Sequence, residues 1–300
     1  MIDAAEELHG IYSGLSDAWR TWMSDKSIVE NSPAAQWLRD DLPDTTVTTF
    51  EVLLKGIEFS VMETGLAVRD HLRSLTSAYP TPAIRQADPE ASPWPGSSAF
   101  TLARSILEGT ALITWLLDGT VDHDERARRS ARLILWSAHH GTRWADATGN
   151  THEPTATPDY WKQIIEEAGF PVTTVQGQFV VERRFQHTEV ISAAFGDHGK
   201  HLYSRWSGAA HHAPWVLTPG TYLRPDENGG GHYMGTSSRL ADHVDAAADV
   251  SDLLLTSSES IRTYWGRTDT DQRREQISVR AAELRTDAAQ LRAGQDSHES

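Results

Sequence analysis

Apolar residues recur at spacings of three and four along most of this 300-residue chain, which places them on one face of an α-helix. The stretch 4–24 shows the pattern clearly, because Leu8, Leu15 and Trp19 fall on a single face. Alternation of apolar and polar residues, which would indicate a strand, extends no further than residues 179–181. The pattern therefore predicts an all-α fold.

The same period marks the other expected helices, and local signals indicate where several of them begin and end. Pro43 should end the second helix, and Asp122 should cap a later one, with the Glu125 side chain returning the hydrogen bond. Gly56 and Gly65 weaken the longest stretch, which is expected to form one helix or two. The expected helices after the first span residues 33–42, 46–78, 98–118, 123–147, 159–168, 182–195, 200–217, 239–265 and 271–292.

Three stretches rich in proline or glycine are expected to be long loops. They are residues 80–96, 149–158 and 218–237, the last of which contains three consecutive glycines. With these loops, the chain is expected to form a single helical-bundle domain over residues 1–300. Its parts are a core at about 46–217, N-terminal helices in 1–45 and C-terminal helices in 238–293.

The most apolar stretch, 99–117, carries Arg104 and Glu108 near its middle. A charge at the centre of a membrane helix costs roughly 2.5–3.5 kcal/mol, so a buried helix of a water-soluble protein is expected. The chain has no cysteine, and its start lacks the basic and apolar regions of a secretory signal. These features predict no membrane contact, no disulfides, no thiolate metal sites and a cytoplasmic location.

The formal net charge of −15 argues against tight non-specific binding to DNA, which needs a basic surface to displace counterions. A local basic groove is still compatible with this charge. The basic residues are nearly all arginine, with lysine at only four positions, and alanine is frequent. This composition is typical of a GC-rich bacterial genome.

The densest group of polar side chains lies within residues 203–215. On a helix, Tyr203, Ser207 and His211 form one stripe, and Arg205 and His212 share a second face. In one interpretation these groups form a site. In the other, they satisfy one another or the backbone within the fold.

If the group is a site, each residue has an expected role. Arg205 would bind a phosphate or carboxylate bidentately, and His211 or His212 would act as general acid or base near neutral pH. The catalytic residues are also expected to include Tyr203, Ser207 and Glu108. Substrate binding is expected to involve Arg104 and Trp206.

Arg104 and Glu108 lie one helical turn apart on an otherwise apolar helix. We expect both to be at least partly buried, with the Glu108 carboxylate near the helix that carries Tyr203. A metal ion could alternatively be bound by His139 and His140 together with the carboxylate of Glu108 or Glu63. The chain has none of the recognised ligand spacings, so no metal or other cofactor is expected.

Two pairs, Arg205 with His212 and Arg132 with His139, fit the arginine–four-to-six–histidine pattern of HEPN-type ribonucleases. The segments LARSILEGTALITWLLD and LYSRWSGAAHHAPW resemble a group of uncharacterised all-helical proteins of actinobacteria, which is more remotely similar to HEPN-like bundles. The likeness covers roughly residues 98–217. It implies a four-to-five-helix core in which the Arg104/Glu108 helix packs beside the Tyr203 helix. The residue after the motif arginine is usually small and polar, whereas here it is Trp206, which weighs against catalysis.

Three functions fit these residues. The first is a HEPN-like, metal-independent endoribonuclease or toxin or defence effector that acts on RNA, as a homodimer across the histidine helix. The second is a non-catalytic helical module that binds a protein or a ligand. The third is a small-molecule, biosynthetic enzyme with a Trp-rich pocket around Glu108 and His211. A basic groove containing Arg205 would favour the first, a flat apolar patch the second, and an enclosed aromatic pocket the third.

Overall fold

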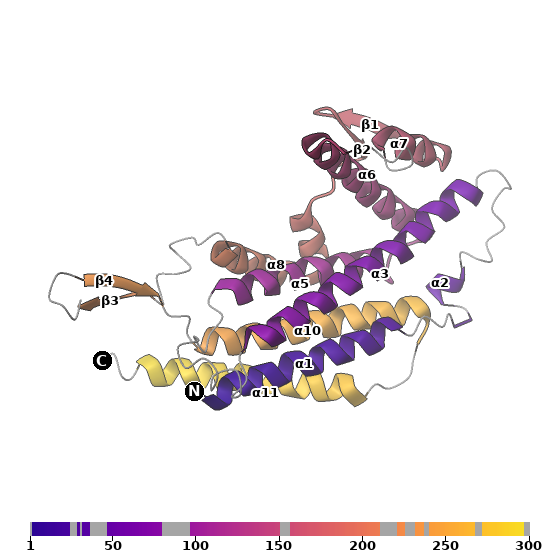
Figure 1. The fold of residues 1–300 in the computed structure, drawn as a ribbon. Helices are drawn as coiled ribbons and strands as arrows, with labels where there is room; N and C mark the ends of the chain where they lie inside the picture. The colour runs from indigo at the N-terminus through magenta and orange to yellow at the C-terminus, as the bar shows by residue number, and fades with distance from the viewer. Residues whose placement is uncertain are drawn as a thin grey trace.

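Helices dominate the computed structural model, which describes residues 2–24, 29–30, 32–36, 47–79, 97–150, 157–210, 221–225, 232–236, 240–267 and 272–296 (Figure 1). The all-α helical bundle predicted from the sequence is confirmed. The helices are α1 (Ile2–Ser24), α2 (Pro33–Gln36), α3 (Val47–Ala78), α5 (Ser97–Leu116), α6 (His123–Thr148), α7 (Pro158–Glu167), α8 (His187–Ala210), α10 (Leu240–Trp265) and α11 (Gln272–Asp296). The strands are β1 (Val172–Val175), β2 (Gln178–Val181), β3 (Thr221–Pro225) and β4 (His232–Thr236).

The long helices pack in layers (Figure 1). Helix α5 packs against α3, α8 and α10, and α1 packs against α3 and α10. Helix α11 covers α10, while α6, α7 and the β1–β2 hairpin form a group that contacts α3. Within the described part of the chain, no helix is both long enough and apolar enough to span a bilayer.

The apolar stripe predicted on the first helix faces the core. Leu8, Leu15 and Trp19 are buried, and the Trp19 indole N–H donates a hydrogen bond to the carbonyl oxygen of Gly65 at 2.8 Å. The side chain of Met23 packs directly over Gly65. Helix α3 therefore continues through Gly65 as one helix, supported by α1 where its own sequence is weak.

Helix α11 is attached to α10 by a few buried apolar residues and by several arginine–carboxylate pairs. Leu284 and Ala288 are buried, while Arg285 pairs with Asp252 and Arg292 with Asp245. Exposed ion pairs contribute at most about 1 kcal/mol each. The apolar contacts and the number of pairs together hold this helix.

Both β-hairpins differ from the expectation of an all-helical chain with loops. Strands β3 and β4 pair antiparallel within 218–237, which was predicted to be a loop. Strands β1 and β2 pair through a tight turn in which Gln176 and Gly177 have φ of 51° and 77°, the positive values that two-residue hairpin turns require. Three of the four residues of β1 are exposed, so this strand shows no alternation of apolar and polar positions.

Helix α8 begins later than predicted and is broken where a break was expected. Residues 182–186, expected to be helical, are not helical, and α8 starts at His187. A helix end was predicted between 195 and 200, and Gly196 interrupts α8 there with φ 61° and ψ −146°. The predictions for residues 80–96 and 211–217, and for the continuation of the second helix over 37–42, lie outside the described residues.

The predicted cap of α6 is present in part. The Asp122 carboxylate accepts a hydrogen bond from the Glu125 backbone N–H at 2.8 Å, as expected of an N-cap residue. The Glu125 side chain, expected to return the bond, instead accepts hydrogen bonds from Arg128 and Arg129.

Removing this cap should destabilise the fold measurably. We expect Asp122→Ala to lower the free energy of unfolding by about 0.5–2 kcal/mol, because the first turn of α6 loses a hydrogen-bond acceptor. Asp124→Ala is the matched control, since it removes a carboxylate from the same turn without removing the cap. Urea denaturation followed by circular dichroism measures both, and equal losses would contradict a specific capping role.

Candidate functional site

Arg104, Glu108 and Tyr203 form a polar group between α5 and α8. Arg104 donates hydrogen bonds to Glu108 Oε1 at 3.0 Å and to the Tyr203 hydroxyl at 3.1 Å. Its guanidinium carbon lies 4.9 Å from the centre of the Tyr203 ring. The side chains of Arg104 and Glu108 are 23% and 27% exposed. The predicted partial burial is confirmed, and Arg104 links the Glu108 carboxylate to α8.

Arg205 and Ser207, two further predicted site residues on α8, do not join this group. Arg205 donates a hydrogen bond to Asp242 of α10 at 2.8 Å, so a carboxylate of the fold already neutralises its charge. The Ser207 hydroxyl is buried and has no hydrogen-bond partner among the described residues. His211 and His212 lie outside the described residues.

Trp206, predicted to bind substrate, is a core residue in this structure. Its side chain is 0% exposed, on the interior face of α8. A ring without accessible surface cannot contact a substrate, so the position of Trp206 argues against the predicted role. The large apolar side chain of Trp206 packs among the other residues of the hydrophobic core.

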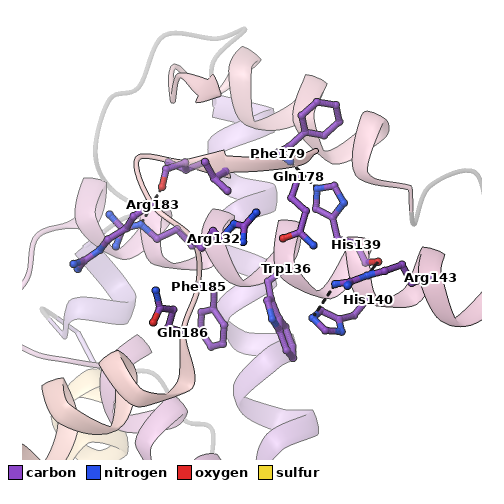
Figure 2. A pocket seen from close by; sticks show the side chains of 13 residues that line it. Arg132, Trp136, His139, His140, Arg143, Gln178, Phe179, Arg183, Phe185 and Gln186 are labelled. Atoms are coloured by element: carbon purple, nitrogen blue, oxygen red, sulfur yellow. Dashed lines mark hydrogen bonds between the residues drawn. The ribbon is translucent and has the colours of Figure 1, made fainter. Parts of the chain in front are cut away.

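A cationic pocket lies between α6 and β2, away from the predicted group (Figure 2). Its volume is about 410 Å³. Four arginines and two histidines line it, and none of its lining residues, all in the described part of the chain, is acidic. The lining residues are Arg132, Trp136, His139, His140, Arg143, Gln178, Phe179, Val180, Val181, Arg183, Arg184, Phe185 and Gln186.

One wall of the pocket is a face of α6. The positions 132, 136, 139, 140 and 143 are spaced by three or four residues, so a helix projects them to one side. The His139 ring accepts a hydrogen bond at Nε2 from the backbone N–H of Phe179 at 2.8 Å. This bond joins α6 to β2 across the pocket (Figure 2).

The opposite wall depends on a strained turn after β2. The Arg183 N–H donates to the Val181 carbonyl oxygen at 2.6 Å, and Glu182 between them has φ 58°. Such a conformation is costly for a residue with a side chain. The Glu182 carboxylate is held by Arg132 at 2.5 Å and by Arg128 at 3.0 Å, which stabilises the turn and directs the chain along the pocket.

The four arginines of the pocket differ in how far the fold neutralises them. Arg132 is 4% exposed and bound to Glu182, so its role is structural. Arg183 lies 3.5 Å from Glu189. Within the described residues, no carboxylate oxygen lies within 4 Å of Arg143 or Arg184.

Among the described residues, the groups that position Arg143 and Arg184 are neutral. Arg143 donates to the His139 carbonyl oxygen at 3.4 Å and to His140 Nε2 at 3.3 Å. Arg184 donates to the carbonyl oxygen of Val175 at 2.7 Å, while its Nε is buried with no hydrogen-bond partner among the described residues. Within that part of the chain, neither guanidinium has a carboxylate partner, so both can bind an anion at the pocket.

Aromatic rings form the inner end of the pocket. The Trp136 ring centre lies 4.4 Å from that of His140, 5.2 Å from Phe185 and 5.1 Å from His187. The planes of these three rings are inclined by 43–82° to that of Trp136, so they form an aromatic cluster beside Arg143 and Arg184. The site can therefore hold an anionic group and a ring together.

Two half-buried histidines near the pocket, His139 and His187, have lowered pKa values. Burial lowers the pKa of His139, and the charge of Arg143 lowers it further. Burial likewise lowers the pKa of His187, which the Glu108 carboxylate opposes. His187 thus connects the aromatic end of the pocket with the Arg104–Glu108 pair.

The sequence identified some of these residues and missed others. The spacing of Arg132 and His139 matched the ribonuclease pattern, and both line the pocket, but hydrogen bonds within the fold occupy both. His140 was predicted only as a metal ligand, and His139 both as a metal ligand and as part of that pattern. Arg143, Arg183 and Arg184 were not singled out, because their convergence depends on pairing α6 with a segment forty residues later.

No protein-family model, curated protein or solved structure matches this chain. Among the described residues, no three histidine or carboxylate side chains converge as metal ligands would. The geometry of the pocket is therefore the basis for assigning a function.

Proposed function

We propose that the pocket between α6 and β2 binds a nucleoside phosphate. The observation that carries this proposal is that Arg143 and Arg184 face the pocket without a carboxylate partner among the described residues. Guanidinium groups bind phosphate through paired, charge-assisted hydrogen bonds. In a chain of net charge −15, such a cationic pocket attracts anions that the rest of the surface repels.

The aromatic end of the pocket favours an anion that carries a ring. Trp136, whose ring lies 5.2 Å from that of the buried Phe185, offers ring surface that an inorganic anion would leave uncovered. Ligand sites for small organic molecules typically have volumes of about 300–1,000 Å³, and this pocket falls in that range. A nucleoside phosphate fits both ends of the pocket, because its base can contact the aromatic residues while its phosphate binds the arginines.

Calorimetric titration tests the proposal with adenosine and uridine monophosphates, the parent nucleosides and inorganic phosphate. We expect the monophosphates to bind more tightly than either fragment. Arg143→Gln should weaken their binding about tenfold or more, because hydrogen bonds to charged groups contribute roughly 1.5–3 kcal/mol. Arg20→Gln, an exposed arginine of α1, is the matched control and should change nothing.

The proposal fails if adenosine binds as tightly as its monophosphate, or if Arg143→Gln binds normally. A second substitution, Arg184→Gln, checks the other cation. Melting temperatures of all variants show whether lost binding reflects lost folding, which matters for Arg184 because it also bonds to Val175.

Metal-independent cleavage of RNA is a second candidate function, and one observation favours it at this pocket. His140 is exposed, and Arg143 donates a hydrogen bond to its Nε2. An accessible imidazole beside a phosphate-binding cation has the groups needed for acid–base catalysis at a phosphodiester. Incubation of single-stranded RNA with the wild type and His140→Ala, in the presence of a chelator, tests this candidate. Cleavage that survives His140→Ala would contradict it.

We further propose that the protein is HEPN-like, forms a homodimer and is located in the cytoplasm. Of the Arg205–His212 pair that fits the ribonuclease pattern, Arg205 is paired with Asp242. The pocket therefore supports binding of a nucleotide more directly than the α8 residues support catalysis.

A further inference from the structure

A row of rings continues from the pocket along the outer face of α6. Trp136, His140 and Trp144 are spaced by four residues each, which places them on one side of the helix. Trp136 lines the pocket, while Trp144 is 64% exposed. A single exposed apolar residue is ordinary on a protein surface. Trp144 differs in its position, because it extends the aromatic wall of a cationic pocket and follows Arg143 directly.

The spacing of this row suits consecutive bases of a single strand. Residues four apart on an α-helix are about 6 Å apart along its axis. Stacked bases are about 3.4 Å apart, so neighbouring bases of an unstacked strand can reach successive rings of the row. Arg143 lies between His140 and Trp144 in sequence, where the linking phosphate would pass.

We infer that the ligand of the pocket is one nucleotide of a single-stranded nucleic acid, with the adjacent base stacked on Trp144. Arginines that follow the backbone and aromatic rings that stack the bases are the combination by which proteins bind single strands. This inference rests on the proposed function and adds that the ligand extends beyond the pocket. RNA and DNA share the chemistry that these residues recognise.

The charges around the row favour a short strand. Lys162 of α7 lies 5.1 Å from the centre of the Phe179 ring, at the edge of the pocket, and its Nζ lies 3.9 Å from Glu166 Oε1. The carboxylates of Glu182 and Glu189, beside the pocket, are paired with arginines. The carboxylate of Asp159 acts on the pKa of His139. Because the whole chain is acidic, only a few phosphates can be accommodated, so a long duplex is disfavoured.

Fluorescence anisotropy with labelled hexanucleotides, rU6 and dT6, tests the inference, with uridine monophosphate measured in parallel. The wild type should bind a hexamer more tightly than the mononucleotide. Trp144→Ala should weaken hexamer binding by about fivefold or more, because stacking on one aromatic residue contributes roughly 1–3 kcal/mol. The same variant should bind the mononucleotide within about twofold of the wild type. Trp144→Phe should restore most of the hexamer affinity.

Phe59→Ala is the matched control, since Phe59 is a 63% exposed aromatic residue on α3, outside the row. It should change neither affinity. Comparison of rU6 with dT6 identifies which nucleic acid is preferred. The inference is overturned if Trp144→Ala binds the hexamers normally, or if a hexamer binds no tighter than the mononucleotide. In either case the proposed function survives when the monophosphate still binds through Arg143. Absence of binding to every nucleotide would overturn both.

Discussion

Replacing Trp206 by alanine should lower the free energy of unfolding by about 3–5 kcal/mol, the range found when large aromatic residues are removed from a core. The ring is 0% exposed and lies among the core residues of α8, so alanine would leave a cavity the surrounding helices can only partly fill. Urea denaturation measures the loss. A normal stability for Trp206→Ala would show that the ring is not packed in the core, and would restore its predicted role in substrate binding.

A comparison of two tryptophans separates packing from hydrogen bonding. The Trp206 indole N–H is buried and has no hydrogen-bond partner in the part of the chain that the structure describes, whereas that of Trp19 donates to Gly65. Trp206→Phe removes an unsatisfied donor, while Trp19→Phe breaks a bond and leaves a buried carbonyl with one partner fewer. We therefore expect Trp19→Phe to cost about 1 kcal/mol more than Trp206→Phe. Equal costs would contradict the hydrogen-bond assignment.

Acidification should destabilise the protein through His243, a fully buried residue of α10. Its ring stacks on Phe100 with centres 5.2 Å apart, and Nδ1 lies 2.8 Å from the Tyr79 hydroxyl. Burial lowers the pKa of His243 to about 4, a shift that Asp242 opposes and Arg205 reinforces. The unfolded chain takes up this proton near pH 6.5, so it binds more protons than the folded chain between pH 6.5 and 4. As the pH decreases from 6.5 to 4, the free energy of unfolding therefore falls by about 3 kcal/mol.

The difference between wild type and His243→Gln isolates this contribution. Urea denaturation at several pH values should show a stability difference that narrows as the pH falls from 6.5 to 4. The raised pKa of buried Asp249 acts with the opposite sign at the acidic end, but it is present in both proteins and cancels in the difference. His201→Gln, at an exposed position of α8, serves as the control. A constant difference across the window would show that His243 does not titrate as its burial implies.

Local signals in the sequence predicted much of the helical framework. The apolar stripe of α1 and the cap at Asp122 depend on residues a few positions apart, so they can be identified without knowing the fold. The two hairpins could not be predicted in this way, because their strands are only four or five residues long. The exposed residues of β1 also show no alternation of apolar and polar positions.

The candidate site was predictable only where its chemistry is local. Arg104 and Glu108 on an apolar helix required a polar neighbour, and Tyr203 was among the residues expected near them. The cationic pocket requires α6 to meet residues 178–186, which the fold arranges through the His139–Phe179 hydrogen bond and the turn at Glu182. In the sequence, Arg143 and Arg184 are indistinguishable from arginines that face solvent.

The packing of α1 against α10 has a consequence for synthesis of the chain on the ribosome. Leu8, Leu15 and Trp19 form a core with helices that include α10, which begins more than 200 residues after α1 ends. At translation rates of about 5–20 residues per second, roughly 10–50 s separate the emergence of the two helices. Of α3 and α10, which pack against α1, only α3 has been synthesised during that interval. The nascent chain therefore exposes an apolar helical face that a chaperone can bind until α10 emerges.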